Sequence, residues 1–237
     1  MKLSTILPSL ILAFPVLSCD HANIARRASE NSTIPLKNFI PGDDPPANPA
    51  TMGYFINHIA LQVSNVTRSR EWYSNVLGMR HIFTVEISPN FTITYMGHSQ
   101  GGRNGTGYQT GGELLRDKNN LAGLVELQHN PNFANRVYNA ENPHNSFSHL
   151  GLIVPDIAAT QAHLESQGVR IIKKTGELDL SGATEESRIV GGMLGVADLK
   201  SVRGDIQAAI PSIKFIGFDL FIVAADPDGN LFEIQPQ

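Results

Sequence analysis

Hydrophobic and polar residues alternate along two distant stretches of the chain, residues 58–63 and 149–154. A period of two is typical of a half-buried β-strand. Each stretch is followed by a helical spacing of apolar residues and then by three more strand-like segments: residues 80–86, 91–97 and 124–128 after the first, and residues 169–174, 217–224 and 231–235 after the second. The pattern predicts an α+β fold of two βαβββ modules, which pack together because neither buries enough apolar surface alone.

The two expected helices carry signals at both ends. Asn65 or Thr67 is the candidate N-cap of the first helix, and Asp156 is the candidate N-cap of the second. Gly78 and Gly168 stand where a helix commonly ends on a glycine. The folded domain is therefore expected over residues 52–237, with module 1 at about 52–130 and module 2 at about 144–237.

Strand geometry places four ionisable residues on the sheet faces that the helices do not cover. His58 and Glu126 belong to module 1, and His149 and Glu233 occupy the matching positions of module 2. If these faces form one concave surface, two imidazoles and two carboxylates make a site for a divalent cation with room for substrate. The alternative is four unrelated residues, with each histidine hydrogen-bonded in the core and each glutamate paired with a lysine or an arginine.

The N-terminal residues have a different character. Residues 1–19 combine Lys2 with an apolar run and small residues at the expected cleavage point, which predicts a secretory signal peptide. Residues 20–51 are rich in proline and poor in large apolar groups, and they are expected to be a disordered arm. The single cysteine, Cys19, lies at the predicted cut, so no intrachain disulfide is expected.

Four N-x-S/T sequons suggest a secreted glycoprotein: Asn31, Asn65, Asn90 and Asn104. The formal net charge of -4 and the pI of about 6.0 do not favour binding to nucleic acid. After the N-terminus, no apolar run is long enough to span a membrane. The expected partner is a small-molecule substrate.

Two long segments interrupt the repeat. Residues 98–120 are glycine-rich and polar, which suggests a flexible lid. Residues 175–216 form an insertion in module 2, and short helices are expected within it at residues 193–197 and 206–210. Beyond this, the sequence assigns no role to either segment.

Several segments resemble the glyoxalase I (lactoylglutathione lyase) family of the vicinal-oxygen-chelate superfamily: "NHIALQV", "EWYSNVLGM", "LVELQHN", "SFSHLGLIVPDI", "SQGVRIIKK" and "DPDGNLFEIQP". The resemblance covers roughly residues 52–237 apart from the two long segments. It implies paired βαβββ modules whose concave sheet encloses a metal site. It leaves open whether that site forms within one chain or across a homodimer that exchanges modules.

The resemblance also implies roles for single residues. His58, Glu126, His149 and Glu233 would hold one divalent ion (nickel, cobalt or zinc), and histidine at the first position is more similar to the nickel- and cobalt-preferring members. Glu233 would also be the general base that converts the thiohemiacetal of methylglyoxal and glutathione to S-lactoylglutathione. The metal would hold both substrate oxygens and stabilise the enediolate while the carboxylate moves the proton.

The expected glutathione contacts are only partly kept. Asn130 and Lys173 match substrate-binding residues of the family, whereas Gln62 and Asn145 stand where the family has arginines that hold glutathione carboxylates. Each missing charge-assisted hydrogen bond would contribute about 1.5–3 kcal/mol.

Two further functions therefore stay open. One is another metal-dependent enzyme of the superfamily, for example a dioxygenase with a site of two histidines and one glutamate, in which Glu126 is not a ligand. The other is a non-catalytic protein that binds a small molecule in the concave surface.

Overall fold

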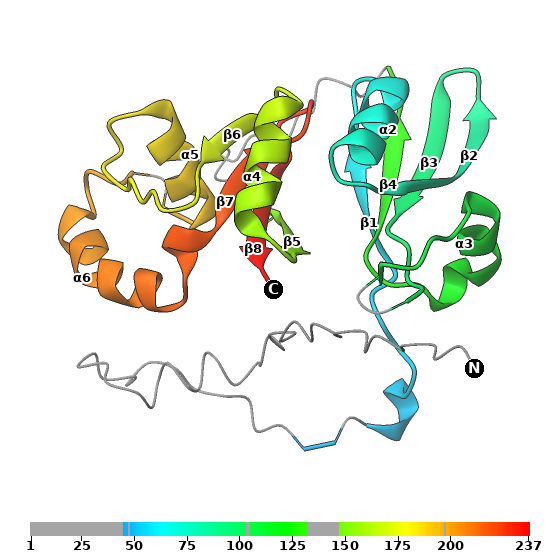
Figure 1. Cartoon of the computed structure of the whole chain (residues 1–237), viewed down its shortest axis with the longest axis horizontal. Helices are drawn as coiled ribbons and strands as arrows, with labels where there is room; N and C mark the ends of the chain where they lie inside the picture. The colour runs from blue at the N-terminus through cyan, green and yellow to red at the C-terminus, as the bar shows by residue number, and fades with distance from the viewer. Residues whose placement is uncertain (1–44, 47, 103–104, 132–146, 197) are drawn as a thin grey trace, which may run out of the picture. The chain divides into compact units, whose positions relative to one another are not determined.

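The computed structural model describes residues 45–46, 48–102, 105–131, 147–196 and 198–237. The predicted signal peptide, most of the predicted arm, and the positions Asn31, Asn104 and Asn145 lie outside the described residues. All described elements belong to the compact unit of residues 43–237 (Figure 1). A short 3-10 helix, η1 (Pro49–Thr51), precedes the first strand.

Module 1 has the predicted order of strands and helix, with the bounds β1 (His58–Gln62), α2 (Val66–Asn75), β2 (Arg80–Ser88), β3 (Phe91–Gly97) and β4 (Leu124–His129). Its four strands form one sheet in the order β1-β4-β3-β2. β1 and β4 are parallel, and the other pairs are antiparallel.

Module 2 repeats this plan, with β5 (Leu150–Val154), α4 (Ile157–Ser166), β6 (Arg170–Lys173), β7 (Ile222–Ala225) and β8 (Leu231–Pro236). Its sheet has the equivalent order β5-β8-β7-β6, again with a parallel first pair. The predicted α+β fold of paired βαβββ modules is confirmed.

The helix ends follow the predicted signals. The side chain of Asn65 accepts a hydrogen bond from the Arg68 amide at 3.0 Å, so Asn65 rather than Thr67 caps α2. Asp156 caps α4 by accepting from the Ala159 amide at 2.9 Å. Gly78 and Gly168 follow the two helices with φ of 68° and 65°, a left-handed conformation that glycine adopts at little cost.

One hydrophobic core is shared by the two modules. Val125 and Leu127 of β4 belong to the same buried cluster as Phe232 and Ile234 of β8, together with Tyr73 of α2. The residues on alternate positions of β4 and β8, including both glutamates, therefore lie on the opposite faces of their sheets. The packing buries the apolar faces of both sheets in a common core.

The long segments contain more helix than predicted. Within residues 98–120, expected to be a flexible lid, Thr110 and Glu113 form a capping box that starts α3 (Gly111–Asp117), and η3 (Lys118–Asn120) follows. The insertion contains α5 (Glu185–Met193) and α6 (Arg203–Phe215). α6 confirms and extends the helix expected at residues 206–210.

Two local predictions were wrong. A helix was expected at residues 193–197, but α5 ends at Met193 and Gly195 has a φ of 79°, which does not continue a right-handed helix. A strand was expected at residues 217–224, but Gly217 has a φ of 83° and starts the 3-10 helix η4 (Phe218–Leu220). Pairing in β7 begins only at Ile222.

Candidate metal centre

The first pair of predicted ligands meets on one face of the module 1 sheet. In the parallel register of β1 and β4, Ala60 lies opposite Glu126, and His58 is two residues earlier on the same face. His58 Nε2 lies 3.3 Å from Glu126 Oε2. The Glu126 side chain is buried, whereas about a third of the His58 side chain is exposed, at 36%.

The preceding residue fixes which nitrogen of His58 carries the proton. Asn57 Nδ2 donates to the backbone carbonyls of Lys118 and Leu121, at 2.9 and 2.6 Å. The remaining amide atom, Oδ1, lies 3.0 Å from His58 Nδ1 and can only accept a hydrogen bond. Nδ1 therefore carries the proton, and in the neutral ring Nε2 presents a lone pair toward Glu126.

The second pair repeats this arrangement with different residues. His149 Nε2 lies 3.8 Å from Glu233 Oε2. Ser148 Oγ donates to the Met193 carbonyl at 2.8 Å and lies 2.8 Å from His149 Nδ1, so it accepts the Nδ1 proton. As in module 1, the residue before the histidine leaves Nε2 directed at a carboxylate.

These two half-sites fit a divalent cation. Metal-binding histidines in proteins usually donate their second ring N–H to an acceptor, which fixes the tautomer and the ring orientation. The lone pair of His58 Nε2 and the carboxylate oxygen Oε2 of Glu126 are 3.3 Å apart and repel each other unless a positive charge lies between them. That charge is either a proton on Nε2 or a metal ion. One nitrogen and one carboxylate from each module supply the mixed donor set that Zn, Ni and Co accept.

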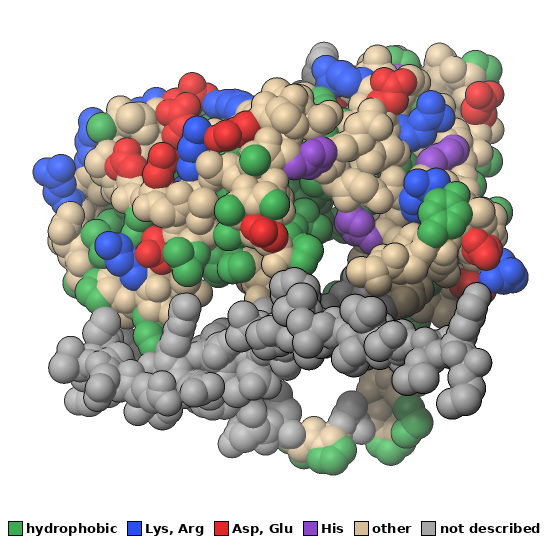
Figure 2. Space-filling view, viewed as in Figure 1, with side chains coloured by type: hydrophobic (Ala, Val, Ile, Leu, Met, Phe, Trp, Pro, Cys, Tyr) green, Lys and Arg blue, Asp and Glu red, His purple; other side chains and the backbone are tan. Residues whose placement is uncertain are grey.

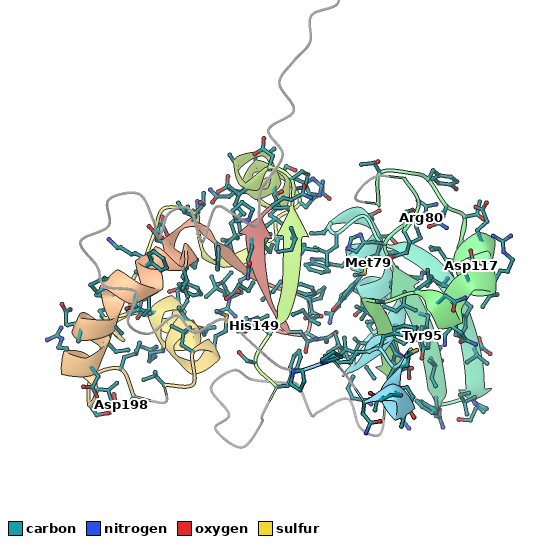
Figure 3. The ribbon with its side chains drawn as sticks, turned by 90° about the horizontal axis from the view of Figure 1, so that it is seen from below. Met79, Arg80, Tyr95, Asp117, His149 and Asp198 are labelled. Carbon is teal, nitrogen blue, oxygen red and sulfur yellow. The ribbon has the colours of Figure 1, made fainter. Side chains whose placement is uncertain are left out.

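The described part of one chain does not bring the two half-sites together. No three histidine, cysteine, aspartate or glutamate side chains among the described residues form a group that could hold a metal. The reason is the shared core, which contains the apolar faces of both sheets and so turns the Glu126 and Glu233 faces away from it. Figure 3 labels Tyr95 on the first sheet and His149 beside the second. The complete four-residue site stays a prediction.

Residues that the sequence did not identify surround Glu126. Gln128 Nε2 donates to Glu126 Oε1 at 2.6 Å, and the Tyr95 hydroxyl donates to Oε2. Burial works to raise the pKa of Glu126, but these hydrogen bonds, with the nearby His58 and Lys118, outweigh it and hold the pKa below its usual value. Period-two alternation puts Tyr95 on one face of its strand, but only the register, which pairs Tyr95 with Glu126, shows the contact.

The two predicted substrate-binding residues are placed differently. Asn130 comes directly after β4 and is half-buried. Lys173 is buried, and its ammonium donates to the backbone carbonyls of Lys174, Asp219 and Phe221, at 3.3, 3.1 and 2.6 Å. Burial lowers the pKa of Lys173 to about 8. Its hydrogen-bonding capacity is used within the protein.

The long segments pack on the same sheet faces as the glutamates. In module 1, Leu114 of α3 forms a buried cluster with Tyr95 and Leu124. In module 2, Ile189 of α5 and Ile206 of α6 share a cluster with Val223 and Leu231, which flank Glu233. Each segment therefore forms a wall beside its half-site. The Met193 carbonyl, at the end of α5, also holds Ser148 behind His149.

The face of the described residues in Figure 2 carries no stripe of a single charge sign. Lysine, arginine, aspartate and glutamate side chains are interspersed over the face in Figure 2. No described helix is both long and apolar enough to cross a bilayer. Of the two predicted glycosylation sites that are described, Asn65 caps α2 and Asn90 follows β2, and both are exposed. Their glycosylation stays a prediction.

Comparison with known proteins identifies the superfamily of this chain. The sequence profile of the Glyoxalase/Bleomycin resistance protein/Dioxygenase superfamily matches residues 55–182. Because this match spans more than half of the 237 residues, the chain belongs to that superfamily. The predicted resemblance is confirmed at the level of the superfamily.

Individual relatives are more distant. The chain is 27% identical over 127 residues to a lactoylglutathione lyase of Pseudomonas aeruginosa, a match that covers 52% of this chain and 70% of that protein. Among solved structures, the trypanothione-dependent glyoxalase I of Leishmania major aligns over 77% of this chain and 86% of its own, with 15% identity and a TM-score of 0.44. Glyoxalase I of Zea mays aligns over 76% of this chain and 43% of its own, with 16% identity and a TM-score of 0.43.

Proposed function

We propose that this protein is a divalent-metal-dependent lyase of the glyoxalase I type, which converts the thiohemiacetal of methylglyoxal and glutathione to S-lactoylglutathione. One observation carries the proposal. In both modules a histidine has its Nδ1 proton held by the preceding residue and its Nε2 directed at a glutamate, at 3.3 and 3.8 Å. Matching half-sites of this kind are hard to explain as two unrelated core histidines.

The bound metal ion would polarise the substrate oxygens and stabilise negative charge that develops on them. His58 and His149 would each offer Nε2, and Glu126 a carboxylate that is already held by two hydrogen bonds. Glu233 would take a proton from one substrate carbon and return it to the adjacent carbon, as a general base must be able to do.

We further propose that the working unit is a homodimer in which each complete site combines module 1 of one copy with module 2 of the other. The shared core turns the two glutamate-bearing faces of one chain away from each other, so a second copy is needed to bring a His58 half-site against a His149 half-site. A two-fold axis would then create two equal sites.

Complementation of two inactive variants tests this arrangement. One variant carries His58→Ala with Glu126→Ala, and the other carries His149→Ala with Glu233→Ala. Each alone should be inactive. In mixed dimers one of the two sites recovers all four ligands, so an equal mixture refolded together should regain about a quarter of wild-type activity. No recovery, with mixed dimers shown by mass spectrometry, would contradict a site shared between copies.

The substrate is tested with purified protein, loaded in turn with nickel, cobalt and zinc. The thiohemiacetal should be isomerised with at least one of these ions, and metal analysis should find one ion per complete set of four ligands. Lack of turnover with all three, despite bound metal, would contradict the lyase activity. Glu126→Ala separates the proposed site from a dioxygenase-type site, because full retention of the metal would mean that Glu126 is not a ligand.

A second candidate is a metal-dependent enzyme of the same superfamily that acts on a small molecule other than glutathione adducts. Two observations favour it: Gln62 donates its amide to Gln128 at 2.6 Å, and Lys173 is buried against backbone carbonyls. Neither side chain is presented as a cation to a glutathione carboxylate. Turnover of the methylglyoxal adduct of a small neutral thiol, at a rate equal to or above that of the glutathione adduct, would support this candidate.

We also propose that the mature protein is secreted and glycosylated. The apolar residues 1–19 and the exposed sequons at Asn65 and Asn90 support this proposal. Expression in a eukaryotic host should yield protein in the medium that starts near residue 20 and loses mass on treatment with an N-glycosidase. Retention inside the cell with an intact N-terminus would contradict it.

A further inference from the structure

The two glutamates of the proposed site have unequal surroundings. Glu126 accepts hydrogen bonds on both oxygens, from Gln128 and from Tyr95. Among the described residues, Glu233 accepts a hydrogen bond on Oε1, from Gln235 at 2.6 Å, while its Oε2 faces His149 at 3.8 Å. The glutamine two residues after the glutamate is common to both modules. The second hydrogen bond is particular to module 1.

The sheet register explains this difference. Tyr95 pairs with Glu126 across β3 and β4, and the equivalent pair across β7 and β8 is Val223 with Glu233. Cross-strand partners lie on the same face and are close enough for their side chains to meet. A valine has no donor, so the position that fixes Glu126 in module 1 offers Glu233 only apolar contact.

The Tyr95 side chain is itself held in place. It is 6% exposed, and its ring stacks on Phe83 with centroids 4.8 Å apart at an angle of 16°. The Lys118 ammonium lies over the ring, 4.5 Å from its centroid. The Tyr95 oxygen also lies 3.3 Å from His58 Nε2, so one hydroxyl touches both ligands of this half-site.

Gln62 extends the same network. Its Nε2 donates to Gln128 Oε1 at 2.6 Å, which leaves the Gln128 amide nitrogen to donate to Glu126. A glutamine side chain has a single acceptor oxygen and a single NH₂ group, so Gln62 orients the Gln128 amide. In module 2 the residue that pairs with Gln235 is Ile153, which cannot do this.

We infer that Tyr95, Gln128 and Gln62 are positioning residues that hold Glu126 as a fixed metal ligand, whereas Glu233, with Val223 and Ile153 at the positions of Tyr95 and Gln62, is held by Gln235 on one oxygen. This inference rests on the proposed function. It assigns Gln62, at the position of a family arginine, to the metal centre rather than to the substrate. Outer residues that orient metal ligands commonly contribute 10- to 100-fold to metal affinity.

Cobalt titration, followed by the visible absorption of the bound ion, tests the inference without any substrate. Tyr95→Phe should weaken cobalt binding by about 10- to 100-fold and change the absorption spectrum, because Glu126 loses one of its two hydrogen bonds. The matched control is Tyr73→Phe, which removes a buried hydrogen bond of 3.0 Å from a tyrosine to Asp226. The control should lower stability and leave cobalt affinity and spectrum unchanged.

Gln62→Leu provides a second test, because Gln62 is exposed and its loss should not unfold the chain. It should weaken cobalt binding less than Tyr95→Phe does, since it acts on Glu126 through Gln128. Unchanged cobalt affinity in Tyr95→Phe would overturn the inference, as would equal losses in Tyr95→Phe and Tyr73→Phe. For Gln62, a raised KM with unchanged cobalt affinity would identify a substrate contact instead. If wild-type protein binds no metal, the proposed function fails, and this outcome is distinct from the others.

Discussion

Replacement of Lys173 by methionine should change how stability depends on pH. The ammonium is buried, donates to three backbone carbonyls and lies 5.3 Å from the centre of the Phe218 ring. Burial lowers the pKa from 10.5 to about 8, and the nearby carboxylates, including Asp219, offset this only in part. The folded protein therefore releases this proton at a lower pH than the unfolded chain does.

The sign and the size of the effect follow from linkage. Between pH 8 and pH 10.5 the unfolded state binds more protons at Lys173 than the folded state, so stability rises with pH over this range. The full shift corresponds to about 3 kcal/mol. Lys173→Met also removes three hydrogen bonds to backbone carbonyls, but that cost does not depend on pH. The difference in stability between the two proteins at two pH values therefore isolates the titration of Lys173.

Urea denaturation of both proteins at about pH 7.5 and about pH 10.5 measures this quantity. Wild-type protein should gain about 3 kcal/mol relative to Lys173→Met between the two conditions. A difference that is the same at both pH values would refute the reasoning, because it would mean that Lys173 titrates normally in the folded protein. If the substitution raised KM at least tenfold with no effect on stability, Lys173 would be a substrate contact and not a buried structural residue.

Two further predictions concern helix α2, its contact with Asp228 and the turn that follows it at Gly78, and urea denaturation tests both. Asp228→Ala removes the carboxylate that accepts hydrogen bonds from Arg68 at 2.9 Å and from the fully buried Ser69 hydroxyl at 3.2 Å. It should therefore lower the unfolding free energy by about 2–4 kcal/mol, and a loss below about 0.5 kcal/mol would contradict this account. Gly78→Ala should lower the unfolding free energy by about 1–2 kcal/mol because the φ of Gly78 is 68°. The control Gly151→Ala, where an added Cβ meets open space, should leave the unfolding free energy unchanged. Equal effects of the two substitutions would show that backbone conformation is not the cause.

The repeated module could be predicted because strand alternation is a local property. The alternation within each strand shows which of its residues share a face. The structure confirms that Val125, Leu127, Phe232 and Ile234 lie on the faces that form the core. The prediction failed at residues 217–224, where the positive φ of Gly217 turns the chain into η4. Phe218 and Leu220 continue an alternating pattern there, so the sequence alone could not distinguish this turn from a strand.

The candidate site was predicted only in part because hydrogen bonds across a sheet depend on register. His58 and Glu126 could be placed on one face from their own strands, but nothing in the sequence shows that Tyr95 pairs with Glu126 and Val223 with Glu233. A shift of one residue would move Tyr95 to the opposite face. The difference between the two glutamates therefore becomes visible only in the folded sheets.

The sequence by itself determined the two modules, the faces of their strands and the histidine and glutamate of each half-site. Tertiary structure alone decided how the modules pack. Alternation separates an apolar face from a polar face, but either arrangement of two such modules, polar faces together or apolar faces together, satisfies it. Within one chain the apolar faces share a core, because burying residues such as Leu127 and Ile234 there removes apolar surface from water. The half-sites are consequently turned apart and left for a partner to complete, as proposed.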